Sequence, residues 1–164
     1  MTTTDKNARG SSAQFFVAGE LCRRDLVAVV TMGNTPNTDI LCSNKEGTKF
    51  VHIQVKTFRP KDSKVMVGLK AEIDNGEQFI WVLSGIPEKD ETDEFVYYII
   101  PSNILSEQVR NSHKAWHEGT PTNGRTRNSE NKQRVVDLPP KVSHTGWSIE
   151  SYKNRWDIIE SLLK

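Results

Sequence analysis

The apolar positions of this chain change from a helical to a strand-like spacing along its length. Residues 12–24 carry apolar side chains at helical spacing, which predicts an amphipathic helix. Residues 64–70 indicate a weaker strand or an irregular connection, while Ser102 or Asn103 is expected to cap a second helix and residues 148–164 to form a third. The remaining runs are rich in β-branched and aromatic residues and predict strands at 26–32, 38–43, 49–58, 79–83 and 95–100.

The order of these elements predicts one α/β domain. At 164 residues the chain has the usual size of a single domain with its own core. Residues 1–10 are polar, so we expect a disordered tail followed by one domain over residues 11–164. Residues 118–146 are rich in Gly, Asn, Thr, Ser and Pro and are expected to form a long basic loop within that domain.

A turn signal joins the second and third predicted strands. Residues 44–47 read Asn-Lys-Glu-Gly, and the glycine can adopt the positive φ that a tight turn requires. The segments 38–43 and 49–58 are therefore expected to pair as a hairpin. In that arrangement Asp39 lies beside the following strand.

The third predicted strand carries residues suited to phosphate chemistry. Gln54 and Lys56 are two positions apart, so they share one face of the strand, while Val55 points to the other face. Mg²⁺ prefers oxygen ligands and is commonly held by one or two carboxylates together with substrate phosphate. The Asp39 carboxylate, the Gln54 amide oxygen and the Val55 backbone carbonyl would provide such a set. Lys56 would then orient the attacking water or neutralise charge on the phosphate.

The first predicted helix offers another acid. Gly19 and Glu20 interrupt its apolar stripe. A glycine inside a helix costs about 1 kcal/mol relative to alanine, so its presence here indicates either close approach to another backbone or a packing role. On the first interpretation, Glu20 is a candidate for the metal or its water shell.

These residues together resemble the PD-(D/E)xK nuclease superfamily, which includes restriction enzymes, Holliday-junction resolvases, some homing endonucleases and small bacterial members. The resemblance implies a restriction-endonuclease-like αβββαβ core, with a mixed central sheet flanked by helices. Two departures are visible: Thr38 precedes the aspartate, and glutamine replaces the usual carboxylate, which makes this a QxK variant. The helix acid, the metal-ligand aspartate, the acidic position of the (D/E)xK element and its lysine are matched by Glu20, Asp39, Gln54 and Lys56.

The same resemblance implies a function. It predicts an endodeoxyribonuclease that hydrolyses phosphodiester bonds with Mg²⁺, or Mn²⁺ as the alternative ion, and that works as a homodimer. The residues do not distinguish DNA from RNA. The alternative is a catalytically inactive nuclease-fold module that binds nucleic acid or protein, because the neutral Gln54 removes one negative charge from the metal site.

Positive charge is local in this sequence. The net charge of +1 gives no overall attraction to nucleic acid, so binding must come from patches of basic residues. A merely solvated loop is the alternative for residues 118–146. The residues expected to contact phosphates are Arg125, Arg127, Lys132, Arg134 and, on the preceding helix, Lys114.

The remaining signals are those of an ordinary intracellular domain. The sequence has neither an apolar run near 18 residues nor a secretory signal, so a cytoplasmic location without a membrane partner is the default expectation. Cys22 and Cys42 lack zinc-site spacing and are expected to be reduced core thiols. We expect three tryptophans to be core anchors rather than stacking platforms for bases: Trp116, Trp147 and Trp156.

Overall fold

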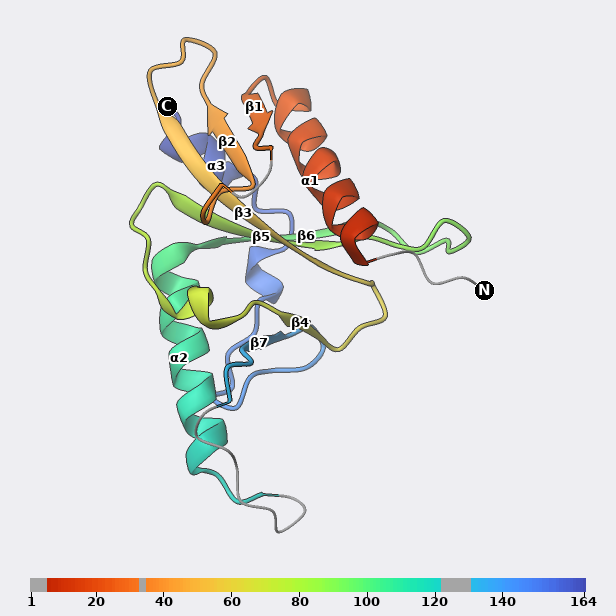
Figure 1. Cartoon of the computed structure of the whole chain (residues 1–164), viewed down its shortest axis with the longest axis vertical. Coiled ribbons are helices and arrows are strands. Elements are labelled where there is room, and N and C mark those ends of the chain that lie inside the picture. The colour runs from red at the N-terminus through yellow and green to blue at the C-terminus, as the bar shows by residue number, and fades with distance from the viewer. Residues whose placement is uncertain (1–5, 33–34, 122–130) are drawn as a thin grey trace.

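The computed structural model describes residues 6–32, 35–121 and 131–164 (Figure 1). Its centre is a five-stranded sheet in the order β1-β2-β3-β5-β6. The first three strands form an antiparallel meander, β5 runs parallel to β3, and β6 returns antiparallel to β5. The strands of this sheet are β1 (Val27–Val30), β2 (Ile40–Ser43), β3 (Phe50–Phe58), β5 (Phe79–Gly85) and β6 (Val96–Pro101).

Helices cover both faces of the sheet. On one face, α1 (Lys6–Arg23) buries a stripe of residues four apart, Ala13, Val17 and Leu21, all fully buried. On the other face, α2 (Ser102–Glu118) packs against the second core cluster. This mixed, helix-flanked sheet confirms the predicted restriction-endonuclease-like fold class. No helix in the described part of the chain is long and apolar enough to cross a membrane.

Some element bounds differ from the prediction. Helix α1 begins at Lys6, so the segment expected to be a tail is helical from that residue onward. The crossover between the parallel strands β3 and β5 contains β4 (Lys64–Met66) and the short 3-10 helix η1 (Leu69–Glu72), in the place where the family pattern has an α-helix. Strand β7 (Val135–Asp137) lies within the segment expected to be a loop and pairs antiparallel with β4. Its central residue Val136 is buried, which explains why this stretch is ordered.

The predicted C-terminal helix over 148–164 is wrong for most of its length. It is replaced by the 3-10 helix η2 (Glu150–Tyr152), a β-bridge from Lys153 to Tyr98, and a short α3 (Asp157–Leu162). Ile149 belongs to the core cluster on the α2 face, whereas Trp156 belongs to the cluster on the α1 face. The chain must therefore pass around the edge strand β6, which one continuous helix cannot do.

Candidate functional site

The β2–β3 hairpin fixes the position of Asp39. Ile40, the first residue of β2, pairs with Ile53 of β3, and the Asp39 amide donates to the Ile53 carbonyl at 2.9 Å. On the other side, the Asp39 carbonyl accepts from the Thr31 amide, also at 2.9 Å. Asp39 is thus held from two sides at the point where the β2–β3 ladder ends.

The Asp39 carboxylate is in direct contact with β3. Its Oδ2 accepts a hydrogen bond from the Val55 amide at 2.7 Å and another from the side-chain amide of Gln54. The charge of Lys56 also acts on this carboxylate. Asp39, Gln54, Val55 and Lys56 are therefore brought together at one strand edge, which we call the strand-edge site.

The Val55 carbonyl also faces this site. Alternate residues of an extended strand direct their amide and carbonyl to the same neighbouring strand. The His52 amide donates to the Gln78 carbonyl at 2.8 Å on the β5 side, whereas the Ile53 carbonyl accepts from Asp39 on the β2 side. Val55 follows Ile53 by two positions, so both of its backbone groups are directed to the side of β3 on which Asp39 lies. The strand geometry thus places a carboxylate and a backbone carbonyl on one side of β3.

Two residues that the sequence did not single out complete the site. The Gln14 side chain on α1 donates a hydrogen bond to the Asp39 carboxylate, and Lys70 on η1 adds a second positive charge near it. Burial raises the pKa of Asp39 above its ordinary value of 3.8, and this exceeds the opposing effects of the Val55 amide, Lys56, Gln14 and Lys70. Asp39 is a half-buried acid whose charged form is disfavoured by burial and only partly restored by its neighbours.

Glu20 does not lie at this site, which corrects the assignment taken from the family pattern. It is six residues beyond Gln14, so it lies about 9 Å further along the helix and on a different side of it. There it pairs with Arg23 at 2.9 Å and with Arg24 at 3.6 Å. It also faces Tyr97, whose pKa is raised to about 12, first by burial and then by the Glu20 charge. The presence of Gly19 next to Glu20 did not indicate which end of α1 lies near Asp39.

The residues expected to bind phosphate fall into three groups. Arg125 and Arg127 lie outside the described residues. Lys132 is exposed, and Lys114 is 73% exposed with Glu118 at 4.0 Å. Arg134, however, is buried, which corrects its assignment as a phosphate contact.

The reason for the burial of Arg134 is a set of fixed partners. Its guanidinium forms an ion pair with Glu72 and donates to the backbone carbonyls of Asn131 at 2.6 Å and Gln133 at 2.9 Å. A guanidinium held in this way joins β7 to η1. The sequence gave no signal for this pairing, because Glu72 is 62 positions away.

The ligands at the strand-edge site suit a hard cation that receives few ligands from the protein. Within the described ranges, no cluster of three or more His, Cys, Asp or Glu side chains is placed to hold a metal ion. Asp39 offers one carboxylate, and the groups that donate to it, the Gln54 side-chain amide and the Val55 backbone, each also carry a neutral oxygen. Mg²⁺ sites of this kind complete their shell with water and substrate phosphate. The residues present therefore fit Mg²⁺ with a single protein charge.

The same overall fold occurs in a nuclease of known structure. The chain superposes on the bacterial homing endonuclease I-Ssp6803I with a TM-score of 0.57 and 13% sequence identity, over 98% of this chain and 95% of that chain. Its superposition on Archaeoglobus fulgidus Hjc, a Holliday junction resolvase from an archaeal hyperthermophile, has a TM-score of 0.44 and 16% identity over 78% and 83% of the two chains. No protein-family model and no curated protein matches the sequence. At 13% identity, the first superposition shows a shared fold.

Proposed function

We propose that this chain is a Mg²⁺-dependent endodeoxyribonuclease that hydrolyses phosphodiester bonds. The observation that carries the proposal is the contact of the Asp39 carboxylate with the Gln54 side-chain amide and the Val55 backbone amide, together with the charge of Lys56 that acts on it. The fold shared with a homing endonuclease supports DNA as the substrate. Fold alone does not fix function, so the proposal rests on the site.

Each residue of the site has a role in this proposal. The Asp39 carboxylate, the Val55 carbonyl and the Gln54 amide oxygen would hold Mg²⁺, or Mn²⁺ as the alternative ion. When bound, the ion supplies a Lewis acid for a phosphoryl oxygen. Lys56 holds the attacking water or balances the negative charge that develops on the phosphate, and Lys70 adds positive charge to the same site.

One observation favours a second candidate function. Of the residues that the structure gathers at the strand edge, only Asp39 is an acid, since Gln14 and Gln54 are neutral. The raised pKa of Asp39 further disfavours its charged form. A chain that kept the fold and lost the chemistry would act as a nucleic-acid-binding or protein-interaction module.

A cleavage assay separates the two functions. Supercoiled plasmid, linear duplex, branched and single-stranded DNA, and an RNA strand are each incubated with the protein and Mg²⁺, with Mn²⁺, or with a chelator. The nuclease proposal predicts cleavage of at least one DNA that stops on chelation. Binding to DNA without cleavage of any substrate would favour the inactive module.

The same assay bears on the oligomeric state. Nucleases of this type usually cut both strands of a duplex by pairing two subunits, so we propose a homodimer. Sedimentation in the presence of duplex DNA tests this state. A monomer that only nicks one strand of the plasmid would contradict it.

A further inference from the structure

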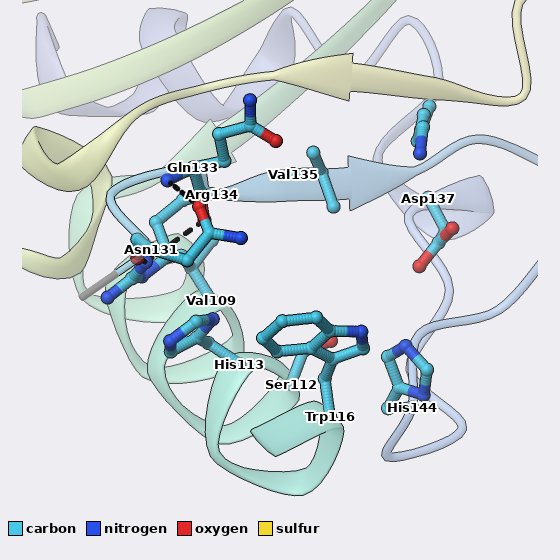
Figure 2. Close-up of a pocket in the computed structure, with 11 residues that line it drawn as sticks. Val109, Ser112, His113, Trp116, Asn131, Gln133, Arg134, Val135, Asp137 and His144 are labelled. Atoms are coloured by element: carbon cyan, nitrogen blue, oxygen red, sulfur yellow. Dashed lines mark hydrogen bonds between the residues drawn. The ribbon is translucent and has the colours of Figure 1, made fainter. Parts of the chain in front are cut away.

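A hollow lies between the C-terminal half of α2 and the β4–β7 ribbon, away from the strand-edge residues (Figure 2). It encloses about 210 Å³. Trp116 projects from α2 toward Val135 of β7, between His113 and His144. Contrary to the expectation of a core anchor, Trp116 thus lines a cavity, whereas Trp156 is buried in the core as predicted. We call this hollow the Trp116 cavity.

The rings of this cavity suit a flat ligand. The centroids of His113 and Trp116 are 5.5 Å apart, with their planes 26° from parallel. Burial lowers the pKa of His113, and the charge of Arg134 acts in the same direction, so the imidazole is neutral at pH 7. A neutral imidazole beside an indole forms a surface on which a planar ring stacks well.

The charges around the cavity are compensated. Arg134 is paired with Glu72, and Lys64 stands opposite Asp137 as its cross-strand partner in the β4–β7 ladder. A phosphate placed here would meet the Asp137 carboxylate and an arginine that is already engaged. The lining therefore favours an uncharged ligand over an anion.

Polar groups and size narrow the class of ligand further. Ser112, Asn131 and Gln133 contribute a hydroxyl and two amides, which can both donate and accept hydrogen bonds. Drug-sized ligands occupy pockets of roughly 300–1,000 Å³, so a cavity of about 210 Å³, which is below this range, accommodates little more than one ring system. A planar, uncharged ring with donors and acceptors on its edge is the chemistry of a nucleobase.

Helix η1 connects the Trp116 cavity to the strand-edge site. Lys70 of η1 acts on the Asp39 carboxylate, while Glu72, two residues later, binds Arg134 in the cavity lining. A strand whose phosphate lies at Asp39 would extend along η1 to reach Trp116.

We infer that the Trp116 cavity receives one unstacked base of a nucleic-acid strand that is engaged at the strand-edge site. This inference rests on the proposed function for the identity of the ligand. Stacking on Trp116 and His113 holds the base, and Ser112, Asn131 and Gln133 bind its edge. Such a pocket favours single strands, ends or distorted duplexes, where a base can leave the stack at low cost.

The test uses a short single-stranded deoxyoligonucleotide with one 2-aminopurine, and it is done with chelator so that cleavage plays no part. The proteins are wild type, Trp116→Ala, Trp116→Phe and, as a matched control on the exposed side of α2, His117→Ala. We expect Trp116→Ala to weaken binding by roughly 5- to 150-fold, the usual effect of losing one stacked base. Trp116→Phe should retain most of the affinity, and His117→Ala should match wild type. Thermal unfolding of each variant shows that it is folded.

Three further probes identify the source of the base: the same oligonucleotide with an abasic site, its RNA counterpart, and free deoxyadenosine. The inference predicts quenching of 2-aminopurine by wild type and not by Trp116→Ala, together with weaker binding of the abasic strand. Equal affinity of the intact and abasic strands, an unaffected Trp116→Ala, or a nucleoside that binds as tightly as the strand would each overturn it. If these binding results hold while no substrate is cleaved, the proposed nuclease activity fails and the base pocket stands. If DNA is cleaved but Trp116→Ala binds normally, the base pocket alone fails.

Discussion

Helix η1 separates two surfaces that treat charge in opposite ways. At the strand-edge site, one half-buried carboxylate lies among Lys56 and Lys70, and burial raises its pKa. At the Trp116 cavity, Arg134 is paired with Glu72 and Lys64 faces Asp137. The first surface gains from a cation and a phosphate that complete its charges, whereas the second has its charges already balanced and suits a neutral ring. Two parts of one molecule can thus be selective for different portions of the same ligand.

The largest effect should come from Lys56→Met, which keeps much of the side-chain length and removes the ammonium. We expect cleavage to slow by roughly a hundred- to a thousandfold, the cost of losing one group that stabilises developing charge. DNA affinity should change by only a few-fold, because one contact among several is lost. Lys141→Met is the matched control on an exposed loop. Equal losses in the two variants would place Lys56 outside the chemistry.

Arg134 and Lys132 provide a contrast between a structural and a phosphate-binding cation. Arg134→Ala should lower the free energy of unfolding by roughly 3 kcal/mol. This is the lower end of the usual cost of breaking a buried ion pair, because the Glu72 side chain is 26% exposed. Lys132→Ala should leave stability within about 0.5 kcal/mol and instead reduce the slope of log affinity against log salt by roughly 0.9. Denaturant unfolding and salt titrations measure the two effects. Similar stabilities for both variants would contradict the role assigned to the Arg134–Glu72 pair.

Adding a carboxylate to the strand-edge site should tighten metal binding. Gln14→Glu or Gln54→Glu places a second negative charge beside Asp39, and we expect Mg²⁺ affinity to rise roughly tenfold. Glu20→Gln should leave that affinity unchanged, since Glu20 lies further along α1 with Arg23 and Arg24. Calorimetric titration distinguishes the sites. A loss of Mg²⁺ affinity in Glu20→Gln would restore it as a ligand.

The last expected effect is a dependence on pH. Because the pKa of Asp39 is raised in the folded protein, its contribution to stability is present below the unfolded value and is lost as pH rises through the folded value. Mg²⁺ and a proton compete for the Asp39 carboxylate. The affinity for Mg²⁺ should therefore fall by about tenfold for each pH unit below the pKa of Asp39 in the folded protein. Titrations between neutral and acidic pH, with Asp39→Asn as control, measure both trends. A Mg²⁺ affinity that is independent of pH down to the ordinary value of 3.8 would contradict Asp39 as a ligand.

The sequence was informative where local geometry decides position. Strand alternation and the turn after β2 were enough to bring Asp39, Gln54 and Lys56 together, because hairpin register depends on nearby residues. It was uninformative where contacts span the chain. The approach of Gln14 to Asp39 depends on how α1 packs across the sheet, which no short motif records.

The segment around β7 shows the same limit. Basic composition suggested that Arg134 reaches outward, but composition does not reveal a partner 62 positions away. The C-terminal segment also had helical spacing, yet its apolar residues are divided between two core clusters. Tertiary packing overrode local propensity in both places.

The proposed nuclease activity depends most on Asp39, the acid that would hold the metal for cleavage. Single-turnover cleavage at saturating Mg²⁺ should be compared for wild type, Asp39→Asn and Asp25→Asn, with DNA binding measured separately in chelator. Asp25 is a matched control because its side chain is 83% exposed and its φ of 64° is one that asparagine also tolerates. We predict that Asp39→Asn cleaves at least roughly a thousandfold more slowly, as expected for loss of several kcal/mol of stabilisation, while folding and DNA affinity are kept and Asp25→Asn behaves as wild type. A cleavage rate for Asp39→Asn within a few-fold of wild type would contradict the account.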